Sequence, residues 1–245
     1  MDIVCPDEVK ESSVSVLFQA LFAGKPELIA FDLDGTLVDS VPDLTQAVDQ
    51  MRAQLGRPPA GEAAVRTWVG NGAEMLVRRA LAKDGSDEQA NNVSQTLLAN
   101  AMTCFYQNYK QCNGVNSHLY PDVKKTLSTL KSMSIPMVLI TNKPDQFTRP
   151  LLNKLELEGY FDIVLSGDSL AHKKPHPEPL LYAAIRSQVN PMNCLMVGDS
   201  RSDVEAARAS FFKVACVTYG YNHGESISTS KPDGMLESIA ELLHS

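Results

Sequence analysis

The chain has 245 residues, of which 44% are hydrophobic and 21% are charged, a balance typical of a globular protein with a sizeable core. The net charge is −7 and no basic stripe is visible, which argues against a nucleic-acid-binding protein. No apolar run approaches the ~20 residues of a membrane span, so we expect no membrane partner.

The cysteines indicate a reducing compartment. Their number, five, is odd and no CxxC pair occurs, which fits free thiols. Cys194 and Cys216 lie in apolar, strand-like runs, and we expect them to be buried as small hydrophobic side chains. The sequence therefore predicts a cytoplasmic protein. Nothing in it indicates an oligomeric state.

Residues 1–27 form an N-terminal extension. Apolar side chains recur at helical spacing between Val14 and Phe22, and a Gly-Lys-Pro stop signal follows at 24–26. The start is acidic, whereas a secretory signal needs positive charge and a small-residue cleavage site. We expect a short amphipathic helix that lies on the core or on a partner.

Two carboxylates end the first strand-like run, which reads LIAFDL at 28–33. Asp32 and Asp34 are two positions apart, so they project from the same side of the strand end, and Gly35 permits a sharp turn. Adjacent acids repel unless a cation or a shared proton compensates. This favours a Mg²⁺ site in which one carboxylate is a nucleophile and the other an acid or base. The alternative is a surface turn, where Asp and Gly are common.

Residues 43–114 read as a separate helical cap. Apolar residues recur at three and four positions, as in Leu44, Val48 and Met51, and loop signals interrupt the pattern. The cap is inserted into a core formed by residues 28–42 and 115–245. Within it, Gly70-Asn71-Gly72 predicts a flexible turn that can face the core.

The second part of the chain alternates strands with helices. Near-continuous apolar strands between helices predict an α/β fold, a doubly wound parallel sheet with a Rossmann-like core. Ligands of such sheets bind at the carboxyl ends of the strands. The expected strands are 137–141, 161–165, 194–197 and 213–218, and the expected helices are 121–133, 145–155, 177–188, 203–209 and 235–243.

Polar side chains stand at three of these strand ends. Thr141 and Asn142 follow one strand and can donate to phosphate oxygens, although both are also good helix caps. Lys174 precedes a proline-rich turn and can hold a phosphate as a point charge. Asp199 ends another strand and Asp203 lies in the next helical turn, where acids also complement the helix dipole.

The loop around Lys174 offers further candidates that we interpret as ordinary surface residues. Lys173 reads as a solvated basic residue. His172 and His176 lack a Cys or acid partner at metal spacing, and surface histidines are the better interpretation.

The order of these motifs resembles the haloacid dehalogenase superfamily. DLDGT, TN, KP and GDxxxD match its four motifs over roughly residues 28–243. The resemblance implies a Mg²⁺-dependent phosphatase that acts through an aspartyl phosphate. Asp32 would be the nucleophile and Asp34 the acid/base. Thr141 would bind the phosphoryl group, and Lys174 would offset its charge. The implied metal ligands are Asp32, Asp199 and the main-chain carbonyl of Asp34, with Asp203 behind them.

The cap implies a small-molecule phosphate ester as the substrate, because a polymer would not fit beneath it. The cap loop, together with LVDSVPDL, TNKP and KPHPEPLL, is similar to the phosphoglycolate phosphatase family, which implies hydrolysis of 2-phosphoglycolate to glycolate and phosphate. Alternatives are a β-phosphoglucomutase or a pyrophosphatase of the same superfamily. More remote is a phospho-accepting receiver, which is shorter and has no helical insertion. The candidate substrate-binding residues are Gly35, Thr36, Gly70, Asn71, Gly72, Thr141, Asn142 and Lys174.

Overall fold

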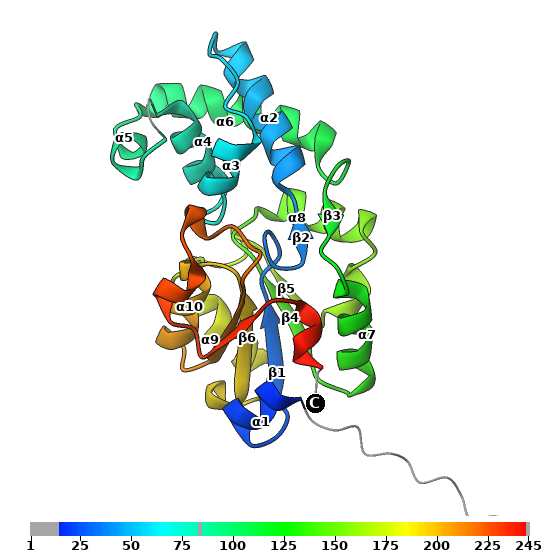
Figure 1. Ribbon diagram of the computed structural model, residues 1–245. Coiled ribbons are helices and arrows are strands. Elements are labelled where there is room, and N and C mark those ends of the chain that lie inside the picture. The colour runs from blue at the N-terminus through cyan, green and yellow to red at the C-terminus, as the bar shows by residue number, and fades with distance from the viewer. Residues whose placement is uncertain (1–14, 83–84, 244–245) are drawn as a thin grey trace, which may run out of the picture.

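The computed structural model describes residues 15–82 and 85–243, so Val14 and Cys5 lie outside the described residues. It confirms the predicted α/β class. A six-stranded parallel sheet with the order β5-β4-β1-β6-β7-β8 forms the core (Figure 1). The strands are β1 Leu28–Phe31, β4 Met137–Ile140, β5 Ile163–Leu165, β6 Cys194–Gly198, β7 Lys213–Val217 and β8 Gly234–Leu236.

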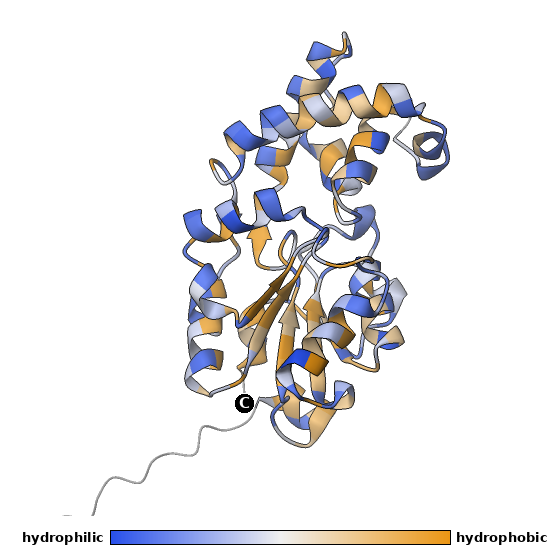
Figure 2. Cartoon of the chain, turned by 180° about the vertical axis from the view of Figure 1, so that it is seen from behind, coloured by the Kyte–Doolittle hydropathy of each residue, from blue (hydrophilic) through white to orange (hydrophobic). Residues whose placement is uncertain are grey.

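Helices cover both faces of the sheet because its strands are apolar on both sides (Figure 2). In β1, Ile29 and Phe31 point to one face, and Leu28 and Ala30 point to the other. The first face packs against α1 Val16–Phe22, α7 Val123–Ser132, α8 Asp145–Lys154 and the 3₁₀ turn η5 Ile239–Leu242; the second packs against α9 Glu178–Ser187 and α10 Arg201–Ala209.

The N-terminal extension contributes to the first of these faces. Within α1, the side chain of Phe18 is fully buried in the cluster that contains Ile29 and Phe31. Leu17, Leu21 and Phe22 pack against the same cluster. The described part of the extension therefore lies on the core, one of the two positions that the sequence suggested.

We call residues 41–112 the cap; its described residues form five helices, which stand above the carboxyl ends of the strands (Figure 1). They bury a hydrophobic cluster of their own, which two aromatic side chains of the core, Phe147 and Tyr221, also join. No helix in the described ranges is both long and apolar enough to cross a membrane. The cap helices are α2 Val41–Gln54, α3 Glu62–Trp68, α4 Ala73–Leu81, α5 Asp87–Asn91 and α6 Gln95–Cys112.

A buried carboxylate joins the two chain segments that run between the cap and the core. Asp43 is fully buried at the start of α2, and its oxygens accept hydrogen bonds from the main-chain N–H groups of residues 114–117. Beside it, β2 Val38–Asp39 pairs with β3 His118–Leu119 in antiparallel fashion. This pair was not predicted, because two-residue strands leave no periodic pattern in a sequence.

The predicted helix over 235–243 is wrong. Its first residues form β8, which extends the sheet beside β7, and a 3₁₀ turn follows. Ser238 starts that turn with a capping box and so separates the two elements. Leu236, Ile239 and Leu242 are buried at a spacing of three, which a helix and a strand followed by a turn satisfy equally well.

Candidate active site

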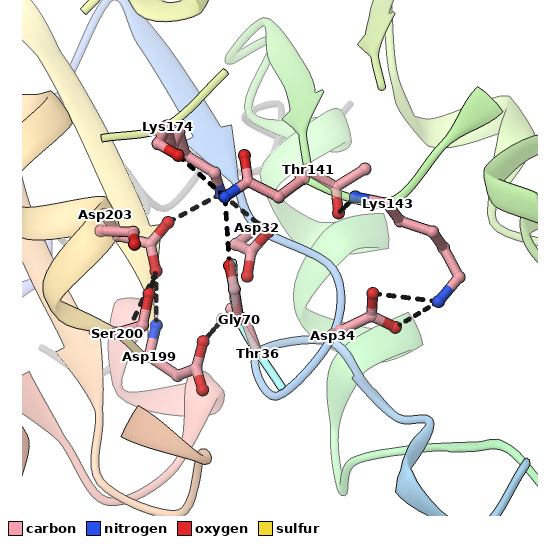
Figure 3. Close-up of polar contacts among 12 residues, drawn as sticks. Asp32, Asp34, Thr36, Gly70, Thr141, Lys143, Lys174, Asp199, Ser200 and Asp203 are labelled. Atoms are coloured by element: carbon pink, nitrogen blue, oxygen red, sulfur yellow. Dashed lines mark hydrogen bonds and ion pairs between the residues drawn. The ribbon is translucent and has the colours of Figure 1, made fainter. Parts of the chain in front are cut away.

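Three carboxylates and one lysine meet at the carboxyl ends of β1 and β6 (Figure 3). Asp32 follows β1, Asp199 follows β6 and Asp203 lies in the first turn of α10. One oxygen from each carboxylate lies within 4.8 Å of the others. Lys174 Nζ donates to Asp32 Oδ1 and Asp203 Oδ1, each at 2.7 Å. All four residues are buried, so water screens their charges only weakly.

The local sequence holds two of these carboxylates in place. Asp203 Oδ2 accepts hydrogen bonds from the N–H groups of Asp199 and Ser200 and from the Ser200 hydroxyl, which forms the capping box of α10. Gly220 allows the chain after β7 to pass Asp199 closely, since a Cβ there would lie 2.1 Å from Asp199 Cβ. Asp199 Oδ2 also accepts the Tyr221 N–H at 2.7 Å.

The electrostatics of the cluster call for additional positive charge. Burial raises the pKa of Asp32 to about 7 against the opposing attraction of Lys174, and Asp203 adds repulsion. Burial, followed by repulsion from Asp32 and Asp203, raises the pKa of Asp199 well above its usual value. Burial also works to lower the pKa of Lys174, but Asp203 and Asp32 outweigh it and raise that pKa, so the lysine stays charged.

The donor set fits a hard divalent cation. Every candidate ligand atom is oxygen, which Mg²⁺ prefers, and a cation would relieve the repulsion between Asp32 and Asp199. Both Asp203 oxygens already accept hydrogen bonds, from Lys174 and from the start of α10. Asp203 therefore holds Lys174 and the start of α10 in position and is not expected to be a direct ligand like Asp32 and Asp199.

Asp34 does not join that cluster, because its side chain turns toward Lys143 (Figure 3). Lys143 Nζ donates to both Asp34 oxygens, at 2.9 and 3.0 Å. Burial works to lower the pKa of Lys143, but the attraction of Asp34 raises it above its usual value. The sequence analysis missed Lys143, although it directly follows Thr141 and Asn142 at the end of β4 and is the cation of the same strand-end string.

A cavity between the cap and the core brings together residues that are distant in the sequence. Apart from the predicted site residues named below, the cavity wall is mostly apolar and includes Leu44, Leu76 and Phe147. Asn142 Nδ2 joins the two halves by donating to Gly70 O at 3.1 Å and to Lys174 O at 2.9 Å. The predicted site residues that line the cavity are Asp32, Asp34, Gly70, Gly72, Thr141 and Asn142.

Four predicted substrate-binding residues do not line the cavity: Lys174, which contacts Asp32 and Asp203, and the three that follow. The Thr36 side chain is fully buried, and its hydroxyl donates to Asp199 Oδ1 at 3.4 Å. Gly35 passes close to the same carboxylate, since a Cβ there would lie 2.3 Å from Asp199 Oδ2. Asn71 links the cap to the core by donating to Ser202 Oγ at 3.2 Å. These residues support the site without lining the cavity.

The environment of His172 and His176 differs from the prediction, which gave these histidines no acid partner. Glu178 provides that partner, with Oε2 2.9 Å from His172 Nδ1. The His172 and His176 rings stack with centroids 4.1 Å apart and planes 21° apart. Both rings are exposed, as expected for a surface loop.

Comparison with known proteins identifies the family. The family model for haloacid dehalogenase-like hydrolases matches residues 26–210. A Nitrosococcus oceani protein named phosphoglycolate phosphatase is 49% identical over 218 residues, which cover 89% of this chain and 95% of that protein. A Pseudomonas putida protein of the same name is 46% identical over 227 residues, with coverages of 92% and 82%.

Solved structures share the architecture. The crystal structure of a predicted phosphoglycolate phosphatase from Haemophilus somnus has a TM-score of 0.82 and 36% identity, and covers 89% of this chain and 96% of its own. A candidate β-phosphoglucomutase from Thermotoga maritima, at 24% identity, has a TM-score of 0.68, with coverages of 88% and 96%. The resemblance predicted from the motifs is confirmed, and this chain belongs to the haloacid dehalogenase-like hydrolases.

Proposed function

We propose that this protein is a Mg²⁺-dependent phosphatase that hydrolyses 2-phosphoglycolate through a phosphorylated Asp32. The observation that carries the proposal is the buried Asp32 carboxylate, which shares Lys174 with Asp203 and opens onto the cavity beneath the cap. A buried carboxylate that is paired with a lysine and faces a cavity can act as a nucleophile, because the lysine is already in position to offset the charge of the transferred group. The four free cysteines among the described residues fit the reducing cytoplasm that we propose as its location.

The proposed reaction begins with attack of Asp32 on the phosphorus. The ester bond breaks opposite the attacking oxygen, and Asp34 protonates the departing alkoxide. Lys174 and Thr141 stabilise the charge on the transferred group. When bound by Asp32 and Asp199, Mg²⁺ would supply the positive charge that lets a carboxylate approach a phosphate.

Asp34 then acts in the opposite direction. It removes a proton from a water molecule, which attacks the phosphorus of the aspartyl phosphate and releases inorganic phosphate. Lys143 holds the Asp34 carboxylate through both oxygens, so the side chain that moves the proton has a fixed orientation. The cap excludes other water from the cavity during the reaction.

The substrate choice rests on the relatives and on the cavity. The two curated relatives named phosphoglycolate phosphatase cover most of this chain. The candidate β-phosphoglucomutase supports only the shared fold, because its identity is 24%. A receiver is disfavoured by the family match over residues 26–210. A small carboxylated ester suits this cavity, because a few polar side chains, including Thr141 and Lys143, stand in a mostly apolar wall beneath the cap.

We expect Asp32→Asn to remove nearly all turnover, because an amide is a poor nucleophile. Asp34→Asn should lower turnover by roughly 10²–10⁴-fold on alkyl phosphates. Its effect on p-nitrophenyl phosphate should be smaller, since that leaving group needs little protonation. Steady-state rates on both substrates measure the difference. Equal losses on the two substrates would contradict the acid role of Asp34.

Gly220→Ala tests the metal site without changing a ligand. The added Cβ would displace Asp199, so the Mg²⁺ concentration for half-maximal activity should rise ~10-fold or more. Gly159→Ala is the matched control, because no atom lies within 4 Å of its added Cβ. Chelator should abolish wild-type activity, and Mg²⁺ should restore it. An unchanged Mg²⁺ requirement in Gly220→Ala would refute the placement of the ion at Asp199.

The substrate assignment predicts that kcat/KM for 2-phosphoglycolate exceeds the values for glucose phosphates, glycerol phosphates and pyrophosphate. A panel of these compounds with Mg²⁺ present measures the order. The assignment is wrong if any of them exceeds 2-phosphoglycolate by about tenfold, equivalent to ~1.4 kcal/mol of transition-state stabilisation. The phosphatase proposal would survive that outcome.

A further inference from the structure

The cavity contains a buried hydroxyl without a partner. Tyr109, on α6 of the cap, lines the cavity and is 2% exposed. Its hydroxyl oxygen has no hydrogen-bond partner. An unsatisfied buried hydroxyl costs about 1–3 kcal/mol, so a residue of this kind usually meets a ligand or water. Burial raises the pKa of Tyr109 against the opposing attraction of Lys143, so the hydroxyl stays protonated and can donate its proton to a ligand.

A cation lies beside this hydroxyl. Lys143 Nζ is 5.0 Å from the centroid of the Tyr109 ring and donates to both oxygens of Asp34. An ammonium group has three N–H donors, so one remains after these two bonds, and it faces the Tyr109 hydroxyl and any ligand beside it. Lys174, the other buried lysine of the site, is engaged by Asp32 and Asp203. Lys143 is thus the buried lysine of the cavity wall that keeps a donor beyond its carboxylate contacts.

A helix N-terminus of the cap also lines the cavity. Gly72, at the N-terminus of α4, and Ala73 both line the cavity. No side chain caps this helix end. The first N–H groups of a helix have no partner within the helix, and its dipole favours negative charge there. A phenol, an ammonium and a helix N-terminus together form a site for a small anion.

We propose that Tyr109 and Lys143 bind the carboxylate of the substrate at the cap side of the cavity. This inference rests on the proposed function, because it assigns the non-reacting end of the same molecule. Tyr109 belongs to the cap and Lys143 to the core, so a carboxylate held by both draws the cap onto the core. Binding energy from this end would then assemble the closed site around the phosphate and raise kcat.

The apolar wall strengthens the selection. Phe105 and Phe147 flank the Tyr109 ring, with centroids 5.5 and 4.7 Å away. A hydrogen bond to a charged group in such surroundings is stronger than in water. An ester without a carboxylate leaves the Tyr109 hydroxyl and the free Lys143 donor unpaired, and a site built this way discriminates against it.

The test compares 2-phosphoglycolate with ethyl phosphate, which has a methyl group in place of the carboxylate. In Tyr109→Phe, the ratio of kcat/KM values for the two esters should fall about tenfold or more relative to wild type. The ring remains, so the packing against Phe147 is preserved, and a thermal melt verifies the fold. Tyr106→Phe is the matched control, since Tyr106 lies one turn earlier on α6 and packs on the same Phe147 ring, 5.2 Å away.

Each outcome has a distinct meaning. A lower ratio in Tyr109→Phe with an unchanged ratio in Tyr106→Phe supports the carboxylate site. A wild-type ratio in Tyr109→Phe, including equal losses on both esters, overturns it, because the hydroxyl then serves only the structure or a water molecule. A wild-type enzyme that does not prefer 2-phosphoglycolate over ethyl phosphate instead overturns the proposed substrate.

Discussion

The site depends on a shortage of positive charge inside the protein. Asp32, Asp199 and Asp203 are buried together, and Lys174 is the ammonium group that contacts two of them. Burial is the largest cause of the raised pKa values of Asp32 and Asp199, and repulsion among the carboxylates adds to it. A bound cation would relieve this repulsion, and so would a substrate whose charge the remaining donors match.

The fold brings these carboxylates together through the order of the strands and a few local contacts. Parallel strands bring their carboxyl ends to one edge, so Asp32 and Asp199, far apart in the sequence, become neighbours on β1 and β6. The glycine at 220 lets a third segment approach Asp199, and the capping box of α10 fixes Asp203. The cap then closes over the edge through contacts such as Asn142 to Gly70.

Much of this was predictable from the sequence. Strand-end placement singled out Asp32, Asp199 and Thr141, because an apolar run followed by polar residues marks the mouth of a parallel sheet. Lys174 was singled out by the proline-rich turn that follows it and by the family resemblance. Apolar spacing and the loop signals that interrupt it predicted helices after the first strand, and α2 to α6 lie there. The helix predicted at 235–243 failed because its spacing of buried residues also suits a strand and a turn.

Other features required three-dimensional contacts. Lys143 stands in the strand-end string after Thr141 and Asn142, but only the structure shows that its Nζ contacts Asp34. Nothing in the sequence distinguishes Tyr109 from Tyr106 on the same helix, and only the structure shows the buried, unpartnered hydroxyl. Thr36 had the right motif position but a different contact, with its hydroxyl toward Asp199.

The most direct test of the account is to trap the phosphorylated enzyme. Asp34→Asn protein with Mg²⁺ and p-nitrophenyl phosphate is quenched in acid during turnover, and its peptides are analysed by mass spectrometry. The account predicts one phosphoryl group on Asp32, because the nucleophile is intact while the base that activates water is missing. Continued turnover with Asp32 unmodified, or with the phosphoryl group on another residue, would contradict it.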